Sequence, residues 1–256
     1  MKKIKDAFSK GKAFIPFITC GDPDLETTKT LIKAMFEEGA DLIELGIPFS
    51  DPVAEGVTIQ DANIRALNAG MTTDKIFDML NEMKDDIAGP VVFMTYANVV
   101  YSYGTEEFIR KSADAGICGL ILPDVPYEEK EEFASVCRKY GIEMISLIAP
   151  TSNERISMIA KDAEGFVYCV SSLGVTGVRS KITSDIGAMT SLVKANTDVP
   201  CAIGFGISTP QQAAEMAKYA DGVIVGSAIV KIIARLGKDC VSEVRKYVHE
   251  MKEAIR

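Results

Sequence analysis

The sequence predicts an α/β protein built as one single-domain (β/α)8 TIM barrel over residues 1–256. Eight short apolar runs alternate with longer amphipathic segments along the whole chain, as expected for a parallel sheet with helical crossovers. The runs are almost continuously hydrophobic, which suits strands covered on both faces. No linker or low-complexity tract divides the chain, and its length is typical of such a barrel. An open doubly wound sheet is the alternative.

The predicted strands follow from the apolar runs, and the predicted helices from the amphipathic segments between them. The strands are expected at residues 13–19, 41–46, 90–95, 119–123, 143–148, 165–170, 200–205 and 221–226. Helical patterns lie at residues 24–39, 74–83, 105–116, 126–141, 153–165 and 209–220. Several of these segments end in glycine, a common residue just beyond a helix C-terminus.

Two connections are longer than the others. The second strand starts 49 residues before the third and the sixth starts 35 residues before the seventh, whereas the other units take fewer than 30 residues. In a barrel, the loops that follow the strands form the catalytic face. We therefore expect extended loops after strands 2 and 6 to carry functional residues.

Composition and charge narrow the function classes. The net charge is −8 and the pI is near 4.9, which argues against a nucleic-acid partner. The six cysteines form no CxxC pair, and the single histidine, His249, has no visible role, so no metal site is expected. The apolar run at residues 13–20 is short and contains Pro16, unlike a signal peptide or a membrane span. These features predict a soluble, cytoplasmic protein.

The segment DLIELGIPFSDPVAEG, residues 41–56, places carboxylates where catalysis would need them. Glu44 stands inside an apolar strand, and Asp51 and Glu55 follow in the loop. At the barrel mouth, desolvation raises the pKa of a carboxyl toward the range useful in acid–base catalysis. A structural glutamate and a solvated acidic loop are the alternatives, but together Glu44 and Glu55 fit an acid–base pair.

Glycines cluster after the last three predicted strands, in SSLGVTGVRS, GFGIS and GSAIVKII. Glycine lets backbone N–H groups approach an anion, and Ser227 begins a predicted helix whose N-terminus favours negative charge. The loops after strands 7 and 8 are common phosphate sites in barrels. The pattern predicts a phosphate-ester ligand. Four aromatic residues near the strand ends could line an apolar pocket, although ordinary packing explains any one of them: Phe17, Tyr96, Tyr168 and Phe205.

A series of motifs, in order along nearly the whole chain, resembles the tryptophan synthase α subunit family. The motifs are PFITCGDP, ELGIPFSDPVAEG, MTYAN, PDVP, SSLGVTG, GFGIS and GSAIVKII. The resemblance implies a lyase that cleaves indole-3-glycerol phosphate to indole and glyceraldehyde 3-phosphate, the α reaction of L-tryptophan biosynthesis. It also implies an allosteric αββα tetramer. No cofactor is expected in this chain, and pyridoxal phosphate is expected only in the β subunit.

The resemblance also assigns roles to residues. Glu44 and Glu55 match the two catalytic carboxylates, one acting at indole C3 and the glycerol side chain, the other on the indole N–H. The substrate pocket is expected to include Phe17, Met94, Tyr96, Ile121, Ile148, Tyr168, Thr176 and Phe205. The phosphate is expected at Gly177, Gly206, Gly226 and Ser227. Pro48 and Asp51 match the loop that contacts the β subunit.

One departure from the family pattern lies in the catalytic loop. The family usually has ADGP, whereas this chain has AEGV, with Glu55 and Val57 in place of aspartate and proline. The longer side chain could misplace the carboxylate, and an error of about 1 Å can cost about 100-fold in rate. Glu55 therefore motivates an alternative function, a non-catalytic, ligand-binding regulator of a β subunit. A free-standing lyase and another phosphate-binding barrel, such as an isomerase, are further alternatives.

Overall fold

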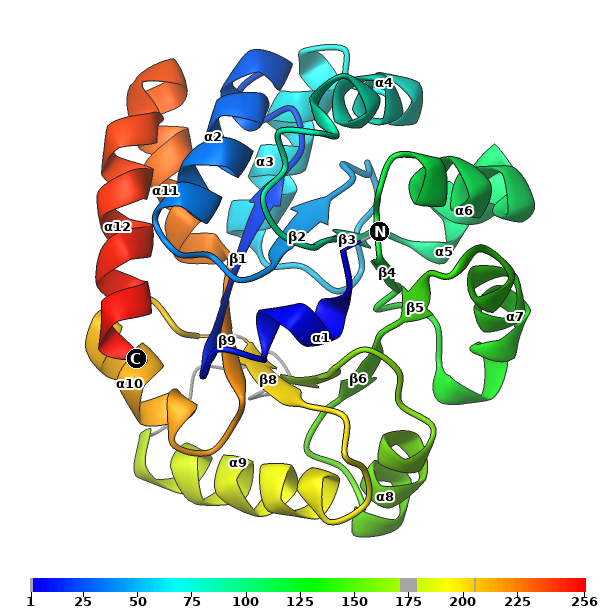
Figure 1. Cartoon of the computed structure of the whole chain (residues 1–256), viewed down its shortest axis with the longest axis vertical. Helices are drawn as coiled ribbons and strands as arrows, with labels where there is room; N and C mark the ends of the chain where they lie inside the picture. The colour runs from blue at the N-terminus through cyan, green and yellow to red at the C-terminus, as the bar shows by residue number, and fades with distance from the viewer. Residues whose placement is uncertain (1, 171–178, 205) are drawn as a thin grey trace.

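A computed structural model gives the structure of residues 2–170, 179–204 and 206–256. Figure 1 shows an inner set of strands surrounded by helices. The strands of the described residues are β1 (Ala13–Thr19), β2 (Ile43–Gly46), β3 (Val91–Met94), β4 (Gly119–Ile121), β5 (Glu143–Met144), β6 (Ser146–Ile148), β7 (Val167–Val170), β8 (Cys201–Gly204) and β9 (Gly222–Val225). All their pairings are parallel.

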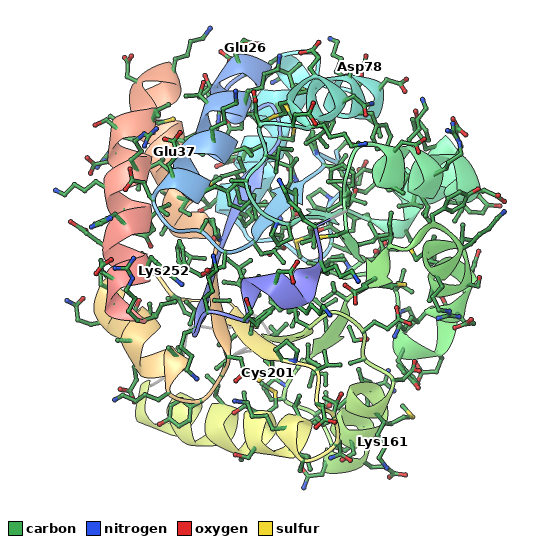
Figure 2. The ribbon with its side chains drawn as sticks, in the orientation of Figure 1. Glu26, Glu37, Asp78, Lys161, Cys201 and Lys252 are labelled. Carbon is green, nitrogen blue, oxygen red and sulfur yellow. The ribbon has the colours of Figure 1, made fainter. Side chains whose placement is uncertain are left out.

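The helices form the outer layer of the barrel, except for the shortest α-helix, which covers its N-terminal end. They are α1 (Ile4–Ala7), α2 (Leu25–Glu37), α3 (Val57–Asn68), α4 (Thr73–Met83), α5 (Ala97–Tyr103), α6 (Thr105–Asp114), α7 (Glu131–Tyr140), α8 (Asn153–Lys161), α9 (Arg179–Lys194), α10 (Pro210–Ala217), α11 (Ser227–Leu236) and α12 (Val241–Ala254). Figure 2 shows the charged side chains of Glu26, Asp78 and Lys161 on this outer ring.

The strand order shows how the sheet becomes a barrel. The order is β5-β4-β3-β2-β1-β9-β8-β7-β6, so β5 and β6 lie at its two ends, although only Ile145 separates them in the chain. The Ile145 N–H donates to the Leu120 carbonyl at 2.9 Å, which continues the pairing of β5 beyond Met144. β5 and β6 are thus two halves of the predicted fifth strand, and the (β/α)8 prediction is confirmed. The prediction of one unbroken strand over 143–148 was wrong in that detail.

Helix starts have local causes in the sequence. The Asp24 side chain accepts a hydrogen bond from the Thr27 N–H at the start of α2. At the start of α10, Thr209 and Gln212 form a capping box and Pro210 occupies the first turn. Such contacts satisfy N–H groups that have no partner inside the helix.

The core has two layers, separated by the alternation of side chains along each strand. Phe14 and Ile18 of β1 pack outward against the helices, whereas Ala13 and Ile15 face the barrel interior. The interior cluster also contains Ile4 of α1, which lies across the barrel in Figure 1. Ile4 meets the starts of strands, so α1 covers the N-terminal end and leaves the C-terminal end for the site.

Candidate active site

Glu44 is a buried carboxyl group in the wall of the barrel. It lies on β2 beside Phe17 of β1 and Val92 of β3, and it is 1% exposed. Leu42, two residues earlier, belongs to the interior cluster, so Glu44 also faces the interior. Burial, and secondly the nearby charge of Glu55, raise the pKa of Glu44 to about 8. Its Oε2 atom has no hydrogen-bond partner among the described residues.

Glu55 lies in the loop between β2 and α3, where several contacts fix it. Asn63 of α3 donates from Nδ2 to the Glu55 Oε2 at 2.7 Å. Gln60 donates from Nε2 to the Glu55 backbone carbonyl at 2.8 Å. The preceding loop position is also fixed, because the Ala54 N–H donates to the Tyr96 hydroxyl at 3.2 Å. Burial raises the pKa of Glu55, while hydrogen bonds from Asn63 and Tyr96 oppose that rise.

The two predicted catalytic residues therefore come together across the barrel mouth. Glu55 is close enough to raise the pKa of Glu44, although the two residues come from different elements. Two carboxyl groups that repel one another in a desolvated site resist being ionised together, so one of them retains a proton near neutral pH. The more deeply buried Glu44 is the better proton carrier, and Glu55, with its hydrogen-bond donors, is the better carboxylate.

Predicted pocket residues surround this pair with apolar surface. Ile121 and Tyr168 belong to the interior cluster, Phe17 packs with residues of α3 and α11, and Met94 contacts both groups. Burial, followed by the charge of Glu44, raises the pKa of Tyr168 well above its usual value, so its hydroxyl group stays protonated. Tyr96 is buried beside the Glu55 loop.

Glycines give these aromatic side chains their space. A Cβ atom at Gly204 would lie 2.4 Å from the Tyr168 hydroxyl oxygen, and one at Gly226 would lie 3.1 Å from the Phe17 ring. Part of the glycine clustering expected for phosphate binding thus has a second physical reason. The glycines allow bulky rings to pack against bare backbone.

The predicted phosphate residues that the structure describes lie near the start of α11 and after β8. Gly226 is the N-cap of α11 and Ser227 is its first residue. Gly206 has φ +76°, and a Cβ atom there would meet open space. Because the N–H groups at a helix start and the helix dipole favour anions, α11 can hold a phosphate group. Thr176, Gly177 and Phe205 lie outside the described residues.

Three further predicted residues are Ile148, expected in the pocket, and Pro48 and Asp51, expected at the partner contact. Ile148 packs with the outer core between strands and helices, whereas its neighbour Leu147 contacts the interior cluster. Pro48 is buried at the start of the β2–α3 loop, and Asp51 is exposed further along it. The Asp51 carboxylate accepts a hydrogen bond from the adjacent Ser50 hydroxyl rather than from a site residue.

Gln60 and Asn63, which position Glu55, were not predicted from the sequence. Both lie on α3, a helix that the patterns above did not predict. The available signal was their spacing, five and eight residues after Glu55, which returns both side chains toward the loop that precedes the helix.

Within the described residues, no three or more histidine, cysteine, aspartate or glutamate side chains group in a way that could hold a metal ion. In the same part of the chain, none of the helices is long and apolar enough to span a membrane.

The fold and the site define a (β/α)8 barrel with a buried and a half-buried carboxyl group at its C-terminal end, beside a helix start suited to an anion. Comparison with known proteins specifies the family. The family model "Tryptophan synthase alpha chain" matches residues 3–256, and the chain belongs to this family.

Individual relatives are similar to this chain over almost its whole length. The tryptophan synthase alpha chain of Lacticaseibacillus casei is 46% identical over 255 residues, covering 100% of this chain and 96% of that protein. That of Thermoanaerobacter sp. (strain X514) is 47% identical over 248 residues, covering 95% and 94%. The crystal structure of tryptophan synthase subunit alpha from Legionella pneumophila superposes with a TM-score of 0.90 at 37% identity, covering 100% and 98%.

Proposed function

We propose that Glu44 and Glu55 are the catalytic residues of this chain. As a member of its family, the chain is a lyase that cleaves indole-3-glycerol phosphate to indole and glyceraldehyde 3-phosphate, the α reaction of tryptophan biosynthesis. The observation that supports the residue assignment best is the buried Glu44, whose pKa is raised to about 8 by burial and by Glu55. Acid–base catalysis near neutral pH works best with a pKa in this range.

The reaction needs a proton at indole C3, loss of a proton from the neighbouring glycerol hydroxyl, and stabilisation of positive charge on the ring nitrogen. Glu44, protonated at neutral pH, supplies the proton to C3 and as a carboxylate accepts the hydroxyl proton. The bond between C3 and the glycerol carbon then breaks, its electron pair enters the ring, and the glycerol carbon becomes the aldehyde. The Glu55 carboxylate accepts a hydrogen bond from the indole N–H and stabilises the charge there.

The remaining pocket residues bind the two ends of the substrate. Phe17, Met94, Ile121 and Tyr168 supply the apolar and aromatic surface that a flat indole ring needs. Tyr96, Thr176 and Phe205 complete the proposed pocket, whereas Ile148, which packs with the outer core, is not part of it. The proposed phosphate group of residues is Gly177, Gly206, Gly226 and Ser227, supported by the start of α11.

We further propose that the chain is one cytoplasmic barrel domain that works with a β subunit in an allosteric αββα tetramer. Exposed apolar residues on the segment that also carries Glu55 support a contact there, since Val53 is 78% and Val57 71% exposed. Pro48 and Asp51 lie on the same segment, so a partner there could alter the position of Glu55. This chain itself needs no cofactor, and pyridoxal phosphate belongs to the β subunit.

Indole release from indole-3-glycerol phosphate tests both parts of the proposal. We would measure wild type, Glu44→Gln and Glu55→Gln, each alone and with added β subunit. We expect a partner-stimulated rate for wild type and a loss of about 100-fold or more in kcat for each variant. A wild-type chain without lyase activity that still accelerates the β subunit would instead indicate a ligand-binding regulator.

A further inference from the structure

Asn63 is a buried amide whose contacts point to a role in the active site. It is 3% exposed and lies on the same face of α3 as Ile59, four residues earlier, which packs with Phe17 of the pocket. Its Nδ2 atom lies 2.7 Å from the Glu55 Oε2, a short contact for an amide donor. Because α3 begins only two residues after Glu55, the helix fixes both ends of this contact.

We propose that Asn63 is a positioning residue of the lyase reaction, which holds the Glu55 side chain as a carboxylate and in one orientation against the substrate ring. This inference rests on the proposed function, because the orientation of the Glu55 carboxylate matters only if that carboxylate accepts a hydrogen bond from the indole N–H. Asn63 itself need not touch the substrate.

The length of Glu55 explains why such a residue is needed here. A glutamate has one more rotatable bond than the aspartate usual in the family, and an unrestrained carboxylate would sample several positions. Asn63 fixes the carboxylate end, while Gln60 fixes the backbone of the same residue at 2.8 Å. Glu55 is therefore restrained at both ends by one helix.

The surroundings of Glu55 show why a hydrogen bond from Asn63 favours its carboxylate form. The charge of Glu55 acts on Glu44 of β2, whose pKa it helps to raise. Asp124 lies near Tyr96, whose pKa it raises, and it accepts a hydrogen bond from the Ala97 N–H at 3.1 Å. Burial raises the pKa of Glu55, and the hydrogen-bond donors that oppose this rise are Asn63 and Tyr96. Loss of the Asn63 donor should therefore raise the pKa of Glu55.

The first test is the pH dependence of kcat for indole release in Asn63→Ala and Asn63→Asp, measured with the β subunit present. We expect kcat at pH 7 to fall about 10- to 100-fold with little change in KM. The acidic limb should move to higher pH, further for Asn63→Asp, whose carboxylate repels Glu55. Asn68→Asp is the matched control on the exposed end of α3, and it should leave the profile unchanged.

The second test separates positioning from support of the fold. In a Glu55→Gln background, Asn63→Ala should cost less than about twofold in kcat, because Asn63 acts through Glu55. An equal loss in both backgrounds, or a loss without a shift of the acidic limb, would overturn the proposal.

A direct measurement keeps the inference testable apart from activity. The side-chain carboxyl of Glu55 can be titrated by carbon NMR, with Glu55→Gln identifying its signal. A higher pKa in Asn63→Asp than in wild type supports the inference, and an unchanged value overturns it. If wild type had no lyase activity, the proposed function would fail, while this titration would still decide whether Asn63 controls the ionisation of Glu55.

Discussion

At the scale of single residues, the burial of Glu44 lowers the stability of the folded protein. Its pKa is raised from 4.5 to about 8, mainly by burial. Between these values the folded protein keeps a proton that the unfolded chain releases, so stability falls as pH rises. Because one pKa unit corresponds to about 1.4 kcal/mol, the penalty is about 3 kcal/mol at pH 7.

Glu44→Gln removes the titrating group and should therefore stabilise the protein while abolishing catalysis. Thermal unfolding from pH 4.5 to 8.5 should show little difference at the acidic end. The Tm advantage of the variant should then grow from about pH 5 and level off above about pH 8. Asp78→Asn, on the exposed face of α4, is the control and should show no such trend. A constant difference between Glu44→Gln and wild type across pH would contradict the assignment of a raised pKa.

Glu55→Asp restores the residue usual in the family, yet we expect it to lower activity. The side chain becomes shorter by one methylene, so the carboxylate no longer reaches Asn63 at the observed 2.7 Å. We expect kcat to fall by about tenfold with a smaller change in KM. Steady-state kinetics of indole release checks this. A variant as fast as wild type would mean that α3 and the loop readjust to the shorter side chain.

Residues of the site could be predicted when their immediate neighbours in the sequence gave a signal. Glu44 stood out because a carboxylate in an apolar strand is unusual, and the structure places it in the interior. Ile148 was predicted to line the pocket but packs with the outer core, because a strand end can direct a side chain to either layer. Asn63 was not predicted, since nothing about an asparagine in a helix indicates that it faces a carboxylate eight residues earlier.

At the scale of elements, α3 is the helix on which the site depends. Arg65 of α3 donates to both carboxylate oxygens of Asp22 at 2.8 Å, and Asp22 is 1% exposed. This two-point contact ties α3 to the loop after β1. The same helix carries Gln60 and Asn63, so the orientation of Glu55 depends on it.

Arg65→Ala leaves the Asp22 carboxylate buried without its partner, and we expect a loss of about 2–3 kcal/mol in unfolding free energy. Arg65→Lys should lose part of this, because a lysine cannot form both bonds. Urea unfolding measures the loss, and kcat should fall a few-fold as α3 shifts. Arg110→Ala on α6 breaks only exposed ion pairs and should cost under about 1 kcal/mol. Equal losses for the two alanine variants would contradict the argument.

At the scale of the whole molecule, the barrel was predictable because apolar runs and amphipathic segments alternate along the whole chain. Less regular elements were not. Nothing in the run EMISLI marks the break at Ile145, which arises because one half of the strand pairs with β4 and the other with β7. The helix α1 has four residues, too few for a helical period to show in the sequence.

This short helix nevertheless closes one end of the barrel. Ile4 is fully buried in the interior cluster, and Cβ atoms at Gly119 and Gly165 would lie within 2.8 and 3.0 Å of its Cδ1 atom. Strand starts therefore carry glycine where Ile4 enters. The contact is at the opposite end of the barrel from Glu44, so it contributes to stability and not to the reaction.

Ile4→Ala should leave a cavity at the closed end and lower the unfolding free energy by about 2–4 kcal/mol. Because the carboxylate pair lies at the other end, kcat at 25 °C should stay within about twofold of wild type. Urea unfolding and indole release, measured on the same preparation, test the two statements together. Ile64→Ala, at an exposed position of α3, should cost under about 1 kcal/mol. An unfolding free energy equal to that of wild type would contradict the first statement and show that α1 merely covers the barrel. A reduced kcat would contradict the second statement and show that the two ends are coupled.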